Sequence, residues 1–538
     1  MERKAGILTR LGVTRVEAQR GSGLLLRSIS VAVAIALVLF LSLYNLTNYP
    51  VTWFDEGSHL HVPKALVRFG VYADYSSEGF RYYGPTVGVG PTVMLPIAAA
   101  FKLFGIGLLQ ARLVMVLYLL AAIYAFYRLA LVLGGRRLAW VATALLVTSR
   151  GVSLIEYGRQ VLGEVPGLFF MATGLALWLA SWEKAGLRRL VLVGLMLGLS
   201  VVTKNQYLLV LVPTLGLAWL ANLLYYRTAP QRIFILPGLI AVACFAVWQI
   251  YMILYLGPAT ASENLEMLRQ QSASAALVFS PGLMKESLKY LLSLDVYLGM
   301  LVPVLGYGLV ISLPRRREGQ RWGTLWILMV VNLVWYVVAS IGWPRYAFPG
   351  LSIASLFVAS FFHWLTDGFQ IGASNLWRTF QGEMASVHQH ALRWAMLLWL
   401  LVMVSRPLSY TVRQIVAPPP NVPVAMAAYL NQHVPRDALI ETFEPEMGFL
   451  TDHRYHFAPT VILQHAVRHV WLGGPPPSEG YDFVQREHPD YVLVGPFAHW
   501  IDLYPAEMLA ERYQRVVQFE ASWPLGYELY AAISSPSP

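Results

Sequence analysis

The sequence predicts a polytopic α-helical membrane protein that ends in a small soluble α/β domain. Of its 538 residues, 57% are hydrophobic and only 13% are charged, whereas soluble domains carry about 25% charged residues. Apolar runs approaching the length of about 20 residues that a helix needs to cross a bilayer recur along most of the chain. After residue 416 these runs stop, and short strand-like segments separated by turns replace them.

The first predicted span covers 24–46 and follows a basic segment, 1–23, that we expect to stay in the cytoplasm. The span is too long for the apolar part of a signal peptide and lacks a small-residue cleavage site, so we expect a retained anchor. A loop at about 47–109 then emerges on the outer side.

Within that loop, the apolar segment 91–104 is short for a span and contains Pro96 and Lys102. If it does not cross, every strongly basic loop falls in the cytoplasm, as the positive-inside rule requires. These loops contain Arg136-Arg137, Lys184 to Arg189, Arg227 to Arg232, and Arg315 to Arg321. We therefore predict about eleven spans, at 24–46, 110–133, 138–155, 165–182, 189–203, 206–226, 233–256, 289–312, 322–341, 346–365 and 393–412.

A proline run, Pro418 to Pro420, marks the boundary between the transmembrane part, 24–416, and a soluble domain, 417–538. The even number of crossings after the first span places this domain outside. Its sequence predicts a helix and four strands, at 422–434, 438–443, 491–494, 513–519 and 527–533.

Composition also narrows the class of function. The net charge of +10 reflects basic loops between spans, so nucleic acid is not an expected partner. The single cysteine, Cys244, excludes an intramolecular disulfide and a cysteine-based metal cluster.

Two adjacent carboxylates, Asp55 and Glu56, follow the first span. Ionisable residues beside an apolar segment are expensive unless they are solvated, paired or used. A solvated pair at a helix start, favourable to the helix dipole, explains them as well as a functional role does. The functional hypothesis is a catalytic pair in which Asp55 is the base.

Other ionisable side chains are predicted on the same outer side. Glu164 enters an apolar run, and an inert ion pair with Arg159 is its alternative explanation. Lys204 ends a span and could instead extend to the lipid headgroups. Arg345 and Tyr346 begin another span, where aromatic and basic residues are common without a function. Together they suit a substrate with a phosphate, held by the cations, and a hydroxyl, deprotonated by a carboxylate.

Two histidines, His59 and His61, lie beside the acidic pair and leave a divalent cation open as a cofactor. Their spacing places them on one side of a strand but on different sides of a helix. The chemistry does not require the ion.

These motifs resemble the bacterial members of the dolichyl-phosphate-mannose protein mannosyltransferase superfamily, which includes the aminoarabinose transferases of lipid A and belongs to the GT-C class of glycosyltransferases. The resemblance covers about 25–365. It rests on Phe54-Asp55-Glu56, Gly84-Pro85-Thr86, Gly90-Pro91-Thr92 to Pro96, Phe104-Gly105, Ala111-Arg112, Gly158-Arg159 to Glu164-Val165-Pro166, Thr203-Lys204, and Arg345-Tyr346 with Pro349.

The resemblance implies inverting transfer of a sugar from a polyprenyl-phosphate donor to a hydroxyl of a lipid, glycan or protein acceptor, outside the bacterial cytoplasmic membrane. Asp55 would match the catalytic aspartate, with Glu56 its neighbour. Glu164 would match an acidic residue of the second outer loop, and Lys204 and Arg345 would match cations near the donor phosphate.

The chain also departs from the aminoarabinose transferases. They carry a Lys-Pro-Pro-Leu-type sequence where this chain has Gly90-Pro91-Thr92, and Arg-Tyr where it has Ser58-His59. Arg81, beside Tyr82, or else Lys64 is the candidate substitute. Lipid A is therefore not implied as the acceptor.

Two other classes of function remain open at this point. One is a transporter or flippase of lipid-linked sugars, with the acidic pair as an ion site. The other is a scaffold whose C-terminal domain binds the cell envelope.

Overall fold

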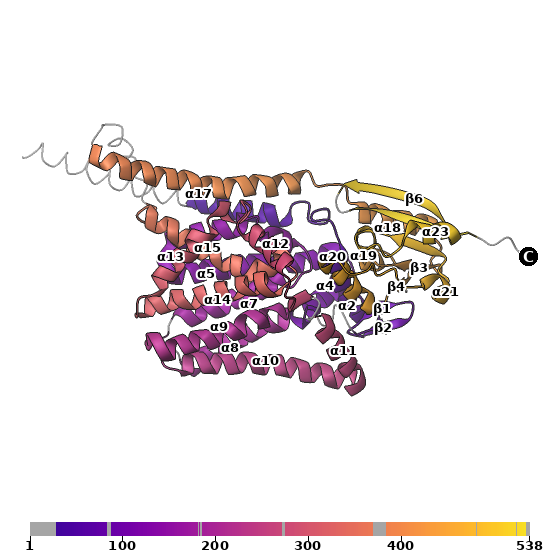
Figure 1. The fold of residues 1–538 in the computed structure, drawn as a ribbon, viewed down its shortest axis with the longest axis horizontal. Coiled ribbons are helices and arrows are strands. Elements are labelled where there is room, and N and C mark those ends of the chain that lie inside the picture. The colour runs from indigo at the N-terminus through magenta and orange to yellow at the C-terminus, as the bar shows by residue number, and fades with distance from the viewer. Residues whose placement is uncertain are drawn as a thin grey trace, which may run out of the picture.

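The computed structural model describes residues 28–82, 88–180, 182, 186–271, 275–369, 384–479, 481–522 and 525–533. Its long helices lie side by side in a bundle, and a sheet-containing C-terminal domain lies beyond one end of it (Figure 1). The predicted fold class is confirmed. The predicted cytoplasmic segment 1–23 and the motif Gly84-Pro85-Thr86 lie outside the described residues.

Six described helical segments are long and apolar enough to cross a membrane, and four shorter helices are also apolar. The six are Leu108–Thr148 (α5), Gln206–Tyr226 (α9, Gln206–Ala221, with a π-helical turn), Arg232–Leu256 (α10), Arg317–Ala339 (α14), Pro344–Leu365 (a 3₁₀ turn and α15, Phe348–Leu365) and Ala391–Val416, within α17, Met384–Val416. The four shorter ones are Ser28–Leu43, Pro91–Phe104 (α4), Glu164–Ala180 (α7) and Leu301–Ser312 (α13). Leu187–Thr203 (α8), Leu154–Arg159 (α6), Pro258–Gln271 (α11) and Pro281–Leu291 (α12) complete the bundle and its connections.

The predicted spans at 110–133 and 138–155 correspond to the two helical parts of α5, which is interrupted at Gly134 and Gly135, where the backbone is not helical. Gly135 has a φ of 76°, a conformation that glycine adopts without steric cost. The single span predicted at 289–312 is divided, because α12 ends at Leu291 and α13 begins only at Leu301. The number of spans therefore stays a prediction.

Successive helices carry the chain back and forth between the two ends of the bundle. Arg345 lies at the end nearest the C-terminal domain, and the 18 residues of α15 then cover about 27 Å. At the far end of α15, the Arg137 guanidinium donates to the Gly368 carbonyl at 2.9 Å. Arg315 lies there too, because α9 leads away from the same domain to Tyr225, and the Arg315 guanidinium is 4.5 Å from the centre of the Tyr225 ring. These basic loops thus share the end opposite the C-terminal domain.

The segment after the first span forms helix α2, Phe54–Phe69, and a hairpin of strands β1, Asp74–Ser76, and β2, Gly79–Arg81. Helix α2 continues through Pro63 and ends at Gly70, whose φ is 73°. It packs against α4, which buries Val93 and Ile97 in a cluster shared with Leu60 of α2.

The C-terminal domain contains a five-stranded mixed sheet in the order β4-β3-β5-β7-β6. Strands β3 and β4 are parallel, as are β3 and β5, whereas β7 is antiparallel to both β5 and β6. The strands are Leu439–Thr442, Arg454–Phe457, Tyr491–Val494, Tyr513–Ser522 and Leu525–Ala532, and the helices are Val422–His433 (α18), Pro445–Leu450 (α19), Thr460–Leu472 (α20), Phe483–Glu487 (α21), Pro496–Trp500 (α22) and Ala506–Arg512 (α23). The sequence analysis did not predict β4, whose four residues include a charged residue and a histidine.

The C-terminal domain packs directly on α2. A β-carbon built at Gly57 would lie 2.3 Å from the backbone nitrogen of Glu446, so this close approach requires glycine. Further along α2, the Lys64 ammonium group donates to the carbonyls of Gly448 and Thr451 at 2.7 and 3.0 Å. Helix α2 therefore packs against both the helical bundle and the C-terminal domain.

Candidate active site

A cavity of about 370 Å³ lies where the bundle, the first loop and the C-terminal domain meet. Its polar lining comes from α2, the β1–β2 hairpin, the connection between α8 and α9, and the 3₁₀ turn Pro344–Ala347 before α15, while aromatic side chains of the C-terminal domain form much of the opposite wall. The lining includes Asp55, Ser58, His59, Asp74, Arg81, Lys204, Gln206, Arg345, Tyr346, Phe443, Phe457, Trp471 and Phe497. Most of the predicted site residues therefore gather in one place.

Asp55 and Arg345 form an ion pair across 290 positions of sequence, in which Arg345 Nη1 donates to Asp55 Oδ2. Burial alone would raise the pKa of the Asp55 carboxyl, but the Arg345 guanidinium holds it below its ordinary value. The guanidinium also lies near two rings, 5.6 Å from the centre of Trp53 and 5.0 Å from that of Trp343. Asp55 is thus a carboxylate in its charged form on the cavity wall.

Lys204 supplies the second cation, and its ammonium group donates to Glu164 Oε1. The end of α8 is fixed by α4, because the Gly90 amide donates to the Thr203 carbonyl at 3.0 Å. The Thr92 and Thr203 hydroxyls also hydrogen-bond at 2.7 Å. The motifs Gly90-Pro91-Thr92 and Thr203-Lys204 therefore contact each other, and this contact positions Lys204.

The Arg345–Asp55 and Lys204–Glu164 pairs leave some polar atoms free. Arg345 Nε and Glu164 Oε2 are buried and have no hydrogen-bond partner within the described part of the chain. A buried donor without a partner is destabilising. The pairing around Arg345 thus leaves one N–H group for a further acceptor.

Arg81 lines the cavity from strand β2, as the sequence analysis proposed for a substitute cation. It pairs with Asp74, and its guanidinium lies 4.8 Å from the centre of the Phe457 ring. Burial would raise the pKa of Asp74, but Arg81 and His61 hold it well below its usual range. Tyr82 does not line the cavity; its carbonyl accepts a hydrogen bond from Asn264 at 3.2 Å.

The structure corrects the expectation that Glu56 acts beside Asp55. Arg112 donates to both Glu56 carboxylate oxygens, at 2.9 and 2.5 Å, and both side chains are fully buried. The Val161 amide donates to the same carboxylate at 3.2 Å. Neighbouring residues on a helix point in directions about 100° apart, so Glu56 faces the bundle while Asp55 faces the cavity.

The structure also corrects two expectations for Arg159, that it binds substrate and that it could pair with Glu164. Its guanidinium is fully buried and donates to the carbonyls of Leu41, Tyr44 and Tyr49, at 2.6, 2.7 and 2.9 Å. Carbonyls at the end of the first apolar helix and in the turn after it have no partner within the helix, and the Arg159 guanidinium supplies their donors. Glu164 pairs instead with Lys204.

The two histidines point to different sides of α2, as their spacing predicts for a helix. His59 faces the cavity with Nδ1 2.7 Å from the Val161 carbonyl, and burial lowers its pKa to about 4 although Asp55 opposes the shift. His61 lies between Asp74 Oδ1 and the Pro445 carbonyl, at 2.6 and 2.7 Å. The geometry does not support a metal ion shared by His59 and His61.

The sequence analysis missed the aromatic wall of the cavity. Phe497 stacks on Phe54 with ring centres 4.5 Å apart, and Phe443 lies 5.2 Å from the same ring. Trp471 packs against Trp343, 5.4 Å between centres. No local sequence pattern predicts these contacts, because each joins the C-terminal domain to a residue more than 100 positions away.

Known structures share this fold, a helical bundle with a small sheet-containing domain at one end. ArnT from Cupriavidus metallidurans bound to undecaprenyl phosphate matches with a TM-score of 0.61 at 14% identity, over 94% of this chain and 98% of that one. The Archaeoglobus fulgidus oligosaccharyltransferase tethered with an acceptor peptide matches with a TM-score of 0.57 at 12% identity, over 94% and 73%. The same enzyme with an inhibitory peptide and a dolichol-phosphate gives 0.55 at 13%, over 94% and 74%.

The family is indicated by a second comparison. Residues 89–251 match the model of the dolichyl-phosphate-mannose-protein mannosyltransferase family. No curated protein sequence matches the chain. The family match over this part of the chain and the shared fold support the resemblance of the sequence to the GT-C glycosyltransferases.

Proposed function

We propose that the protein transfers a sugar from a polyprenyl-phosphate donor to a hydroxyl group of a lipid, glycan or protein acceptor, with inversion at the anomeric carbon. The observation that carries this proposal is the cavity in which a charged carboxylate, Asp55, lies with two cations, Arg345 and Lys204. A base and an anion-binding pair in one enclosed site are what such a reaction needs.

In the proposed reaction, the acceptor oxygen bonds to the anomeric carbon while its proton passes to the Asp55 carboxylate. The bond from that carbon to the phosphate oxygen breaks, and its electron pair leaves with the polyprenyl phosphate. A base is useful only in its charged form, and Arg345 keeps Asp55 charged despite burial. The same guanidinium has Nε free to donate to the leaving phosphate.

Lys204 is proposed to bind the phosphate from the other side, with Glu164 holding the ammonium group in place. Arg81 and Tyr346 complete the polar wall. A polyprenyl-phosphate donor is further supported by the relatives, because ArnT binds undecaprenyl phosphate and the oligosaccharyltransferase binds a dolichol-phosphate.

The acceptor is proposed to lie against the aromatic wall formed by Phe443, Phe457, Trp471 and Phe497. We also propose that cavity and C-terminal domain face outward from the bacterial cytoplasmic membrane. Basic loops lie at the end of the bundle opposite this domain, and such loops are usually cytoplasmic.

The test is transfer of labelled sugar from a polyprenyl-phosphate donor by purified protein offered candidate acceptors. Asp55→Asn should lower the rate by about 10²–10⁴-fold, the usual contribution of a general base. Asp502→Asn, at an exposed position in the C-terminal domain, is the matched control and should retain the wild-type rate. Full activity of folded Asp55→Asn would overturn the assignment, and donor binding without any loss of its sugar would favour a transporter.

A further inference from the structure

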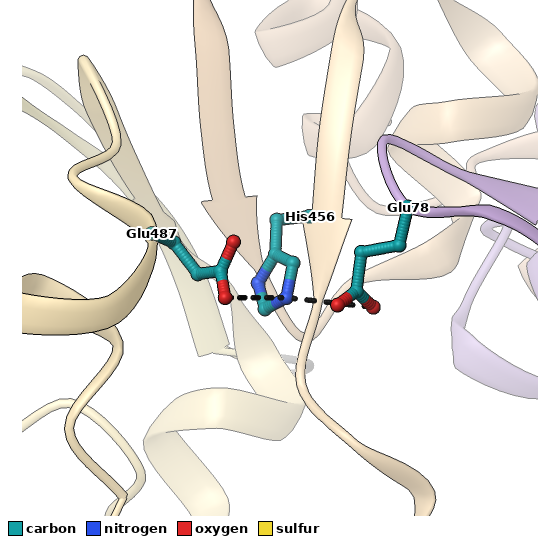
Figure 2. A group of neighbouring side chains, drawn as sticks. All are labelled: Glu78, His456 and Glu487. Atoms are coloured by element: carbon teal, nitrogen blue, oxygen red, sulfur yellow. Dashed lines mark ion pairs between the residues drawn. The ribbon is translucent and has the colours of Figure 1, made fainter.

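A buried histidine outside the cavity, His456 on strand β4, points its ring at two carboxylates from separate segments (Figure 2). His456 is only 3% exposed. Its Nε2 lies 3.7 Å from Glu78 Oε2, in the turn of the β1–β2 hairpin, and 3.9 Å from Glu487 Oε1, at the end of α21. The three potential ligand atoms all lie within 4.8 Å of one another.

The other ring nitrogen of His456 is held by a carboxylate deeper in the domain. Nδ1 hydrogen-bonds to Glu441 Oε2, while the hydroxyls of Tyr481 and Tyr504 each donate to Glu441 Oε1 at 2.7 Å. We assign Nδ1 as the donor in its contact with Glu441 Oε2, because a carboxylate oxygen accepts. A carboxylate behind a histidine fixes the tautomer that presents Nε2 as a ligand, an arrangement found behind most metal-binding histidines.

The distances on the Nε2 side do not fit hydrogen bonds, which end near 3.2 Å for nitrogen and oxygen. A neutral Nε2 facing two carboxylates would also bring three electron-rich atoms together without a donor. Two atoms that bind one zinc ion tetrahedrally at about 2.0–2.2 Å are about 3.4 Å apart. The spacings of 3.7 and 3.9 Å are slightly wider, and small rotations of the two glutamate side chains would close the difference.

We propose that His456, Glu78 and Glu487 bind a divalent transition-metal ion of the zinc type. One imidazole nitrogen and two carboxylate oxygens suit Zn²⁺ better than Mg²⁺ or Ca²⁺, which prefer oxygen ligands alone. The side chains of Glu78 and Glu487 are 58% and 30% exposed, so water has access to a fourth coordination position.

Such an ion would join the first loop to the C-terminal domain. The backbone already begins this connection, because the Ser77 amide donates to the Tyr455 carbonyl at 2.7 Å. The same hairpin carries Asp74 and Arg81 to the cavity wall. The ion would therefore hold one wall of the cavity against the domain that covers it.

The test is zinc binding by the untagged full-length protein, independent of any transfer activity. After dialysis against a chelator, the wild type should bind one zinc ion per chain in competition with a chromogenic indicator, and zinc should raise its melting temperature. Glu78→Gln and Glu487→Gln should each weaken binding at least tenfold and remove the thermal shift. Glu507→Gln, exposed on α23, is the matched control and should bind as the wild type does.

Two further variants separate direct ligation from a structural role. Substitution of cobalt for zinc should give the visible absorption of a bound ion in the wild type and in Glu507→Gln, but not in His456→Gln. Glu441→Gln should bind about 10–100-fold more weakly, because it only orients the histidine. Equal affinity of Glu78→Gln, Glu487→Gln and the wild type would overturn the proposal. Absence of any zinc-dependent shift in the wild type would also overturn it, and would leave a proton on Nε2 between the carboxylates.

Discussion

Two pairs of neighbouring carboxylates lie on the two sides of the contact between α2 and the C-terminal domain, and the fold buries them in opposite ways. Asp55 and Glu56 each face an arginine of their own. Glu444 and Glu446 make no ion pair within the described residues. Glu444 accepts hydrogen bonds from two backbone amides, those of residues 497 and 498, both at 2.9 Å, and Glu446 accepts one from the Tyr527 hydroxyl.

The two environments have opposite effects on charge. Arginine keeps the pKa of Asp55 below its ordinary value in spite of burial. In the second pair, burial raises the pKa of both Glu444 and Glu446. The Glu446 carboxyl raises the pKa of Glu444 further, whereas hydrogen bonds to Tyr527 and Glu444 partly oppose the rise at Glu446. The same functional group, a buried carboxyl, therefore has a lowered pKa where an arginine faces it and a raised pKa where no cation does.

The largest expected effect comes from removing the cation that faces Glu56. Arg112→Met should destabilise the protein by about 3–5 kcal/mol, because it leaves an uncompensated charge in the bundle. Thermal unfolding in detergent measures the loss. The double variant Glu56→Leu with Arg112→Met should regain most of it. Arg128→Met, at an exposed position of the same element α5, is the control. Equal melting temperatures of Arg112→Met and Arg128→Met would contradict the prediction.

Next in size is the removal of the cation that faces Asp55. Arg345→Gln should lower transfer activity by about 10²-fold, the order of one charge-stabilising donor. Loss of Arg345 raises the pKa of Asp55, so the acid limb of the pH–rate profile should move to higher pH. Arg316→Gln, exposed at the far end of the bundle, should leave the profile unchanged. A purely structural Arg345 would reduce activity without moving the limb.

A smaller effect is expected from the second acidic pair, through pH. Because the native pKa of Glu446 is raised from 4.5 to about 7, its contribution to stability is complete below pH 4.5 and is lost as the pH rises through 7. Glu446→Gln stays neutral and should flatten this part of the stability profile. Melting temperatures from pH 4.5 to 8 provide the measurement. Glu507→Gln is the control, and an unchanged slope in Glu446→Gln would refute the assignment.

The smallest effect is expected at an exposed carboxylate of the same interface. Arg68 donates to both oxygens of Asp452, at 2.8 and 2.9 Å, with both side chains more than a third exposed. Arg68→Gln should cost only about 0.5 kcal/mol, and less at high salt, because solvent-exposed ion pairs contribute little and Asp452 keeps its second ion pair, with Lys64 at 2.9 Å. A loss above about 2 kcal/mol would show that this pair, and not burial at Gly57, holds the domain.

The sequence could predict which residues share one end of the bundle, because each charged residue lies where an apolar run begins or ends. That is why Asp55, Lys204 and Arg345 were predicted on one side and lie on one cavity. Strand β5 and helix α18 were also predicted within a residue, since propensity and flanking prolines act locally.

The sequence could not predict the partners. An ion pair of Arg159 with Glu164 was left open because the two are close in the chain, yet Lys204 pairs with Glu164 from 40 positions away. Glu56 and Arg112 meet only because α2 packs across α5. Such pairings depend on the angles between packed helices, which no short sequence pattern records.

The close approach at Gly57 has a consequence for anyone who recombines this protein with its relatives. A C-terminal domain taken from another chain would meet α2 through a backbone-to-backbone contact that tolerates no side chain and no shift. A functional chimaera would therefore need its crossover points placed so that residues 54–69 travel with the transplanted domain. Residues 54–69 of the first loop are therefore structurally matched to the C-terminal domain, and not to the membrane helices on either side of them.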